Sequence, residues 1–192
     1  EAVKAEQDSV LKYFQPYYNY DSSVEKKVLK QLYHDFSVGI EGTPSGTLHV
    51  IAMRLHELYL NGIMSTPEYN RLVPDTTHMI RIVNGKEALS ANAGKFYSTM
   101  SAYEAILHHP SLVPYRSILQ RCNLTDYVLP NLIYDKQRSD TEKSDLLSSI
   151  PLASGMVMSG QKIIDRGEIV NDYTYRVLNS FEREMQRRNA SE

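Results

Sequence analysis

The sequence contains very little cysteine and no long apolar run. Its single thiol, Cys122, excludes an internal disulfide and a zinc site built from cysteines. We therefore expect Cys122 to act as a small buried apolar residue. No segment reaches the roughly 18 to 20 apolar residues that a membrane-spanning helix needs, so we expect any membrane attachment to lie outside these 192 residues.

The sequence also lacks an excess of charge of either sign. It has 21 Lys and Arg residues against 23 Asp and Glu residues, which gives a formal net charge of -2. Nucleic-acid-binding proteins usually carry a basic face, so we expect no nucleic-acid partner. Hydrophobic residues make up 42% of the chain, which suits a globular domain with a sizeable core.

Motifs typical of catalytic and metal sites are missing as well. The sequence has no HExxH, no G-x-S-x-G and no glycine-rich phosphate loop. His49 and His56 share a helix face but lie about two turns apart, too far for one small ion. The pair His34-Asp35 spells the metal-binding dipeptide of HD phosphohydrolases, but no histidine precedes it, so we interpret it as a coincidence. We predict no catalytic residue, no metal site and no cofactor in this chain.

Most of the chain has the apolar spacing of amphipathic helices. The expected helices cover residues 2–14, 24–36, 48–60, 66–73, 98–108, 114–121, 141–150 and 172–185. Residues 17–20 and 131–134 are expected to be extended. Asn84-Gly85 between two apolar runs predicts a hairpin of residues 78–83 and 86–91.

Three short apolar pieces within residues 156–170 are divided by glycines and predict a small meander. The expected fold is therefore α+β, a predominantly helical single domain with a small antiparallel sheet from residues 78–91 and 156–170. Aromatic residues crowd around Pro16, namely Tyr13, Phe14, Tyr17, Tyr18 and Tyr20. We expect half-buried rings at the junction of the first helix with the body, with a carbohydrate-stacking platform as the alternative.

A dipeptide of tyrosine and aspartate occurs twice, each time between an extended segment and a helix. The first copy is Tyr20-Asp21 and the second is Tyr134-Asp135. The repetition marks either two similarly built halves or chance.

Longer patterns surround both copies. The first lies in an element of the form P-x-Y-x-x-D, and the second in an asparagine-hydrophobic-Tyr-Asp element that begins at Asn131. The C-terminal third adds the form V-x-x-G-x-x-I-x-x-x-G-E-x-V, carried by Val157, Gly160, Ile163, Gly167, Glu168 and Val170. Together these motifs resemble the extracytoplasmic domain of the bacterial seven-transmembrane HD hydrolases. The resemblance is specific at both ends and covers residues 1–192 as one domain, whereas residues 40–120 carry no recognisable motif.

The resemblance implies a membrane helix before residue 1, and seven membrane helices and a cytoplasmic HD domain after residue 192. This chain would then lie on the extracytoplasmic, periplasmic side of the plasma membrane as a non-catalytic sensing or regulatory domain. The parent enzyme would hydrolyse cyclic di-AMP with divalent metal ions held in the absent HD domain. The implied partners are an extracytoplasmic ligand or envelope protein and the chain's own membrane helices, and the sequence leaves a homodimer open.

On the predicted meander, the candidate ligand contacts are Gln161, Arg166 and Glu168. A structural turn with a salt bridge is the alternative interpretation of this segment. The residues expected to have a structural role are Tyr20, Asp21, Tyr134, Asp135, Gly160 and Gly167. Two rival functions are an envelope binding or scaffold domain without signalling, and an enzyme with an unrecognised site.

Overall fold

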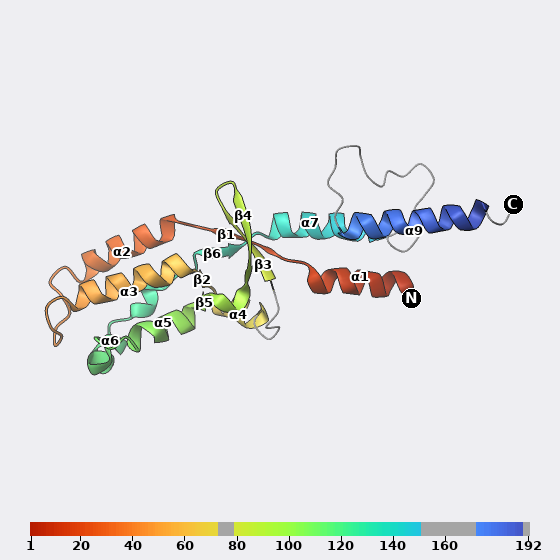
Figure 1. Ribbon diagram of the computed structural model, residues 1–192. Coiled ribbons are helices and arrows are strands. Elements are labelled where there is room, and N and C mark those ends of the chain that lie inside the picture. Colours follow the sequence, from red (N-terminus) through yellow and green to blue (C-terminus); the bar gives the residue numbers. More distant parts are fainter. Residues whose placement is uncertain (73–78, 151–171, 190–192) are drawn as a thin grey trace. The chain divides into compact units, whose positions relative to one another are not determined.

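The computed structural model describes residues 1–72, 79–150 and 172–189 (Figure 1). Within this domain, contacts define two compact units. Unit 1 comprises Glu1–Phe14 and Gln137–Glu192, and unit 2 comprises Gln15–Lys136. Unit 2 is therefore inserted into the sequence of unit 1, with one covalent connection on each side.

Unit 1 contains helices α1 (Ala2–Tyr13), α7 (Lys136–Ser148) and α9 (Asp172–Asn189). Helix α9 buries Val177, while Phe181 and Met185 on its apolar stripe remain about half exposed. The Lys143 ammonium lies 5.9 Å from the centre of the Phe14 ring. None of the described helices is both long enough and apolar enough to cross a bilayer.

Unit 2 contains a four-stranded sheet with the order β4-β3-β1-β6. Its strands are β1 (Tyr17–Tyr20), β3 (Met79–Asn84), β4 (Glu87–Asn92) and β6 (Leu132–Tyr134). The β3–β4 and β1–β6 pairs are antiparallel, whereas β1 and β3 are parallel. The sheet is thus mixed, which differs from the purely antiparallel sheet that the sequence predicts. Three of the described helices separate β1 from β3 along the chain, and such a long crossover allows parallel pairing.

The hairpin is present, but its turn lies one residue later than the sequence predicts. Asn84 pairs with Glu87, so the two turn residues are Gly85 and Lys86. Gly85 has a φ of +63°, the backbone conformation that a hairpin turn of the II′ type requires at its first position. This register places Ile82 opposite Leu89 on one face of the sheet. The predicted meander at residues 156–170 lies outside the described residues.

The helical part of unit 2 surrounds the main hydrophobic core. Helices α2 (Ser23–Asp35), α3 (Thr47–Asn61), α5 (Thr99–Leu107) and α6 (Arg116–Gln120) contribute to it, with the 3-10 segments η2 (Val113–Tyr115) and η3 (Leu124–Tyr127). Helix α3 buries Ile51, Leu55 and Tyr59 completely. Cys122 packs against this core but is only half-buried, and its Sγ donates to the Ile118 carbonyl at 3.3 Å. The predicted fold class, α+β and mostly helical with a small sheet, is confirmed.

A second core cluster joins the sheet to helix α4 (Thr66–Leu72) and the 3-10 segment η1 (Ala93–Lys95). Its buried members are Tyr18, Met64, Leu72, Ile80, Ala93 and Leu132. A short parallel pair, β2 (Ile63–Met64) with β5 (Tyr97–Ser98), lies next to this cluster and was not expected from the sequence. Tyr18 is fully buried rather than half-buried, because its ring belongs to this core.

Candidate functional site

The two tyrosine-aspartate motifs meet in the β1–β6 strand pair. Tyr18 lies opposite Tyr134, and Tyr20 lies opposite Leu132. The rings of Tyr18 and Tyr134 are 5.5 Å apart and tilted by 52°, a favourable aromatic arrangement. The repetition in the sequence therefore corresponds to two strands that pair with each other.

The aspartates mark the two ends of this strand pair. The Asp21 N–H donates to the Asn131 carbonyl at 2.8 Å, and the Asp135 N–H donates to the Tyr17 carbonyl at 2.8 Å. The Asp21 carboxylate also accepts bonds from the hydroxyl and N–H of Ser23 at the start of α2, which lowers the pKa of Asp21. Asp135 accepts a bond from the Asn19 amide at 3.1 Å. Both motif aspartates thus bond across the two ends of the β1–β6 pair.

The buried Tyr18 of this pair forms a hydrogen bond with the carboxylate of Glu68. The Tyr18 hydroxyl donates to Glu68 Oε2 at 2.6 Å, and Arg71 donates to the same oxygen at 2.7 Å. The Arg71 guanidinium lies 5.7 Å from the centre of the Tyr134 ring. Burial, together with the Glu68 carboxylate, raises the pKa of Tyr18. These contacts connect helix α4 to both strands of the pair.

The Asn131 side chain connects the start of β6 to the end of α3. It is 1% exposed, and its Oδ1 accepts from the Ile63 N–H at 2.7 Å. Its amide nitrogen donates to the Tyr59 carbonyl at 2.8 Å. The Tyr20 hydroxyl donates to the same carbonyl at 3.2 Å. Strand β1, strand β6 and the end of α3 are therefore held by one hydrogen-bond network.

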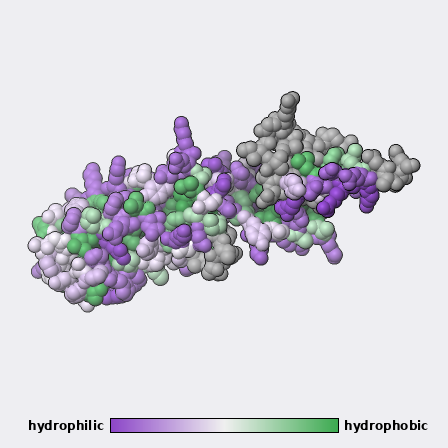
Figure 2. Space-filling model, in the orientation of Figure 1, coloured by the Kyte–Doolittle hydropathy of each residue, from purple (hydrophilic) through white to green (hydrophobic). Residues whose placement is uncertain are grey.

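A pocket of about 490 Å³ opens on the sheet face that carries Tyr20 and Leu132; we call it the sheet pocket. Apolar side chains form most of its wall: Tyr20, Leu60, Ile82, Leu89, Ala91, Phe96 and Leu132. Its polar lining residues are Asn61, Asn84, Glu87 and Ser90. Leu60 is 67% exposed and Leu89 is 66% exposed, so apolar surface extends to the mouth of the pocket. Figure 2 shows apolar atoms on the visible surface of unit 2 near the base of the hairpin.

The sheet pocket has the features of a small-ligand site. Ligand pockets are commonly concave and mostly apolar, with a few polar groups that orient the ligand. Glu87 is the only lining residue with a charge at neutral pH. Tyr20 is also ionisable, and burial followed by the nearby Glu25 raises its pKa, so its hydroxyl stays neutral. The pocket therefore suits a ligand with an apolar part and no negative charge.

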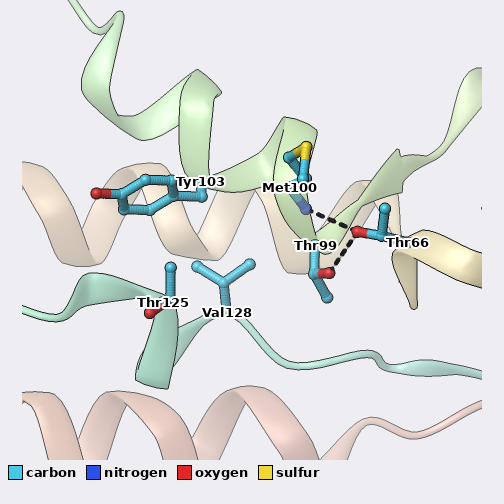
Figure 3. A pocket seen from close by; sticks show the side chains of 6 residues that line it. All are labelled: Thr66, Thr99, Met100, Tyr103, Thr125 and Val128. Carbon is cyan, nitrogen blue, oxygen red and sulfur yellow. Dashed lines mark hydrogen bonds between the residues drawn. The ribbon is translucent and has the colours of Figure 1, made fainter.

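A smaller pocket of about 350 Å³ lies between α4, α5 and η3 (Figure 3). It is lined by Thr66, Thr99, Met100, Tyr103, Thr125 and Val128. The hydroxyls of Thr66 and Thr99 are 2.8 Å apart, and Thr66 Oγ1 accepts from the Met100 N–H at 3.2 Å. These hydroxyls hold the starts of α4 and α5 together, and the pocket does not touch the β1–β6 pair.

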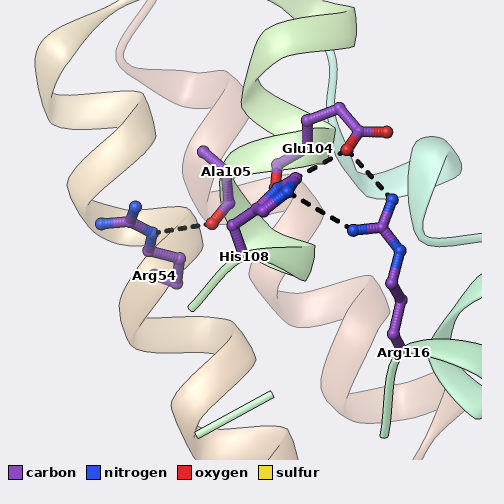
Figure 4. Close-up of polar contacts among 5 residues, drawn as sticks. All are labelled: Arg54, Glu104, Ala105, His108 and Arg116. Carbon is purple, nitrogen blue, oxygen red and sulfur yellow. Dashed lines mark hydrogen bonds and ion pairs between the residues drawn. The ribbon is translucent and has the colours of Figure 1, made fainter. Parts of the chain in front are cut away.

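A polar cluster on α3, α5 and α6 has a structural role (Figure 4). Arg116 donates to Glu104 at 3.3 Å, and His108 lies 3.6 Å from the same carboxylate. Arg54 donates to the Ala105 carbonyl at 3.3 Å and thereby connects α3 to α5. The ion pairs are substantially exposed, so each contributes little to stability.

The histidines that the sequence analysis considered do not converge on one point. His56 contacts Glu25 across α2 and α3, while His49 lies on the first turns of α3. Asp35 of the His34-Asp35 pair accepts from the Tyr127 hydroxyl at 2.5 Å at the end of α2. Within residues 1–72, 79–150 and 172–189, no group of three or more His, Cys, Asp or Glu side chains is arranged to hold a metal ion.

The ligand contacts predicted from the motif, Gln161, Arg166 and Glu168, lie outside the described residues. The same holds for the motif glycines, Gly160 and Gly167. The sheet pocket was not predicted from the sequence, because it depends on the pairing of β1 with β3 and β6. The one sequence pattern that could have indicated it is the alternation of apolar and polar residues in the predicted hairpin, as in Leu89-Ser90-Ala91.

Comparisons with known proteins agree with the motifs. No curated protein and no solved structure matches the chain. The family described as 7TM-HD extracellular matches residues 1–183. This description agrees with an extracytoplasmic placement of the chain and confirms the resemblance stated from its motifs. The chain therefore belongs to the 7TM-HD extracellular family.

Proposed function

We propose that this chain is the extracytoplasmic sensing domain of a membrane-bound HD-type hydrolase, and that the sheet pocket receives its ligand. The observation that carries the proposal is that Tyr20 and Leu132 are register partners in the β1–β6 pair and both line the pocket. A bound ligand would touch both strands of this pair. Family membership supports the sensing role.

The strand pair is also the place where unit 2 connects to the rest of the chain. Strand β1 follows Phe14 of unit 1, and β6 leads directly into α7. The Asp135 N–H donates to the Tyr17 carbonyl, so the two connections leave unit 2 side by side. A ligand with different affinities for two arrangements of β1 and β6 would shift the helices attached to them. We propose that this shift regulates the hydrolase.

For the parent protein, we propose hydrolysis of cyclic di-AMP by divalent metal ions bound in a cytoplasmic HD domain. None of the residues described here takes part in that chemistry. The role of this chain is to bind a ligand outside the membrane and to pass on a change in strand position.

The experiment compares two forms of the full-length protein in proteoliposomes. One is unchanged, and in the other residues 15–136 are replaced by a short Gly-Ser turn between Phe14 and Gln137. We expect both forms to hydrolyse cyclic di-AMP, with different rates. Equal rates would contradict the regulatory proposal and favour a scaffold role, and hydrolysis by the 192-residue chain alone would contradict its non-catalytic role.

A further inference from the structure

Strand β4 forms an open edge of the sheet next to the pocket. It is the terminal strand in the order β4-β3-β1-β6, and its first four residues are exposed. Edge strands are usually protected by charged side chains or proline. In β4, the only charged residue is Glu87 at its beginning, followed by Ala88, Leu89, Ser90 and Ala91. This edge is therefore unusually open to another strand.

The hydrogen-bond pattern shows which backbone groups face outward. The Arg81 N–H donates to the Pro16 carbonyl at 2.9 Å, so the odd-numbered residues of β3 face β1 and the even-numbered ones face β4. Because Ile82 pairs with Leu89, Leu89 directs its backbone groups toward β3. Ala88 and Ser90 consequently direct their N–H and C=O groups away from the sheet, where none of the described residues bonds them.

We propose that the ligand of the sheet pocket is an extended peptide that adds as a fifth strand along β4, which rests on the proposed function of that pocket. The backbone groups of Ala88 and Ser90 provide main-chain bonds, as in other cases of strand addition. Alternate side chains of the added strand lie on the pocket side of the sheet, next to exposed Leu89 and Leu60. This position favours an apolar residue of the peptide.

The charge of Glu87 favours a basic residue in the peptide. Glu87 is the only side chain of the pocket lining that is charged at neutral pH, and Lys86 belongs to the turn and does not line the pocket. A lysine or arginine placed across from Glu87 gains a favourable cross-strand pair, whereas an acidic residue is repelled. The partner is thus a segment of a protein or peptide with alternating apolar residues and a basic residue.

The test is panning of the 192-residue chain against a library of displayed linear heptapeptides, followed by anisotropy measurements on the selected peptides. We expect the selected sequences to alternate apolar residues and to contain Lys or Arg. Ala88→Pro removes one outward N–H without removing a ladder bond, so it should weaken binding by about tenfold or more. Leu89→Lys should weaken binding to a similar extent, and Glu87→Lys should reverse the preference for basic peptides.

Val38→Lys is the matched control, because Val38 is 99% exposed and lies in the loop after α2. It should bind like the unchanged chain. Circular dichroism must show that each variant is folded. If Ala88→Pro does not fold, Ala88→Lys takes its place.

Acidic selected peptides, or binding insensitive to both edge and pocket variants, would overturn the proposal. So would a dimer of the chain that Ala88→Pro dissociates, since the edge would then bind a second copy. Peptide binding that leaves the hydrolysis rate of the full-length protein unchanged would support this inference and contradict the proposed function.

Discussion

Asn131 lies where strand β6, strand β2 and the end of α3 come together. Its side chain is fully buried, accepts from the Ile63 N–H and donates to the Tyr59 carbonyl. The Tyr59 carbonyl has a second donor in the Tyr20 hydroxyl. The buried Ile63 N–H is therefore the group that would lose its hydrogen-bond acceptor if the Asn131 side chain were removed.

We predict that Asn131→Ala lowers the free energy of unfolding by roughly 1–3 kcal/mol, the usual cost of a buried donor left without an acceptor. Chemical denaturation followed by circular dichroism measures the change. The matched control is Asn70→Ala on the exposed side of α4, which should change stability by less than about 0.5 kcal/mol. Equal effects of the two substitutions would contradict the role given to Asn131.

A second residue-scale contact depends on pH. The Tyr127 hydroxyl donates to Asp35, and this bond lowers the pKa of Asp35. A carboxyl whose pKa is lower in the folded state stabilises the fold fully above its unfolded pKa of about 3.9. That contribution is lost as the pH falls through the lower pKa of the folded state.

Tyr127→Phe should therefore destabilise the chain more at pH 7 than at an acid pH below the lowered pKa of Asp35. Denaturation curves of both forms across this range give the difference in unfolding free energy. A difference that stays constant with pH would show that the bond to ionised Asp35 contributes nothing. The aspartate of the His34-Asp35 pair, which the sequence analysis interprets as a coincidence, thus bonds the end of α2 to η3.

At the scale of elements, the end of α3 is fixed by a glycine. Gly62 has a φ of +119°, and a Cβ at this position would lie 2.7 Å from Leu132 and 3.0 Å from Phe96. Both neighbours line the sheet pocket. The backbone of Gly62 therefore forms part of the support beneath the pocket.

Gly62→Ala should be destabilising for two reasons, the positive φ and the contact with these side chains. Gly39→Ala is the matched control, because Gly39 has a φ of +83° and nothing within 4 Å of its added Cβ. We expect Gly62→Ala to cost about 1–3 kcal/mol more than Gly39→Ala in denaturation experiments, the usual range for an overpacked site. Equal costs would mean that the pocket wall yields without strain.

Most helices follow from sequence patterns, whereas the pairing of the strands does not. The helix predicted at 141–150 is an exception, because it begins five residues earlier, at Lys136. The helices at 2–14, 24–36 and 66–73 are confirmed within one or two residues. Pairing of β1 with β3 and β6 joins segments far apart in the chain, and apolar periodicity carries no information about such partners. The sequence predicts the turn one residue too early, because Asn-Gly is typical of a type I′ turn, in which both central residues have positive φ. Of Asn84, Gly85 and Lys86, only Gly85 has a positive φ.

On the scale of the whole molecule, the two hydrophobic core clusters that the described residues form lie within unit 2. We therefore predict that a fragment of residues 15–136 folds independently and unfolds in one cooperative transition. Chemical denaturation monitored by circular dichroism tests this. A fragment without a cooperative transition would show that unit 2 depends on unit 1 for its stability.

In the function proposed above, the β1–β6 pair carries a signal between the pocket and the rest of the chain. Asn19 lies opposite Ile133 in this pair, so Asn19→Cys with Ile133→Cys can form a cross-link in a Cys122→Ser background. Met79→Cys with Asn92→Cys at the open end of the hairpin provides a control cross-link, because neither residue is a register partner of β1 and neither lines the pocket. The measurement is the rate of cyclic di-AMP hydrolysis by the full-length protein, oxidised and then reduced. We expect a reversible change of roughly twofold or more for the first cross-link and none for the second. A cross-link between β1 and β6 that forms fully and leaves the rate unchanged would contradict it.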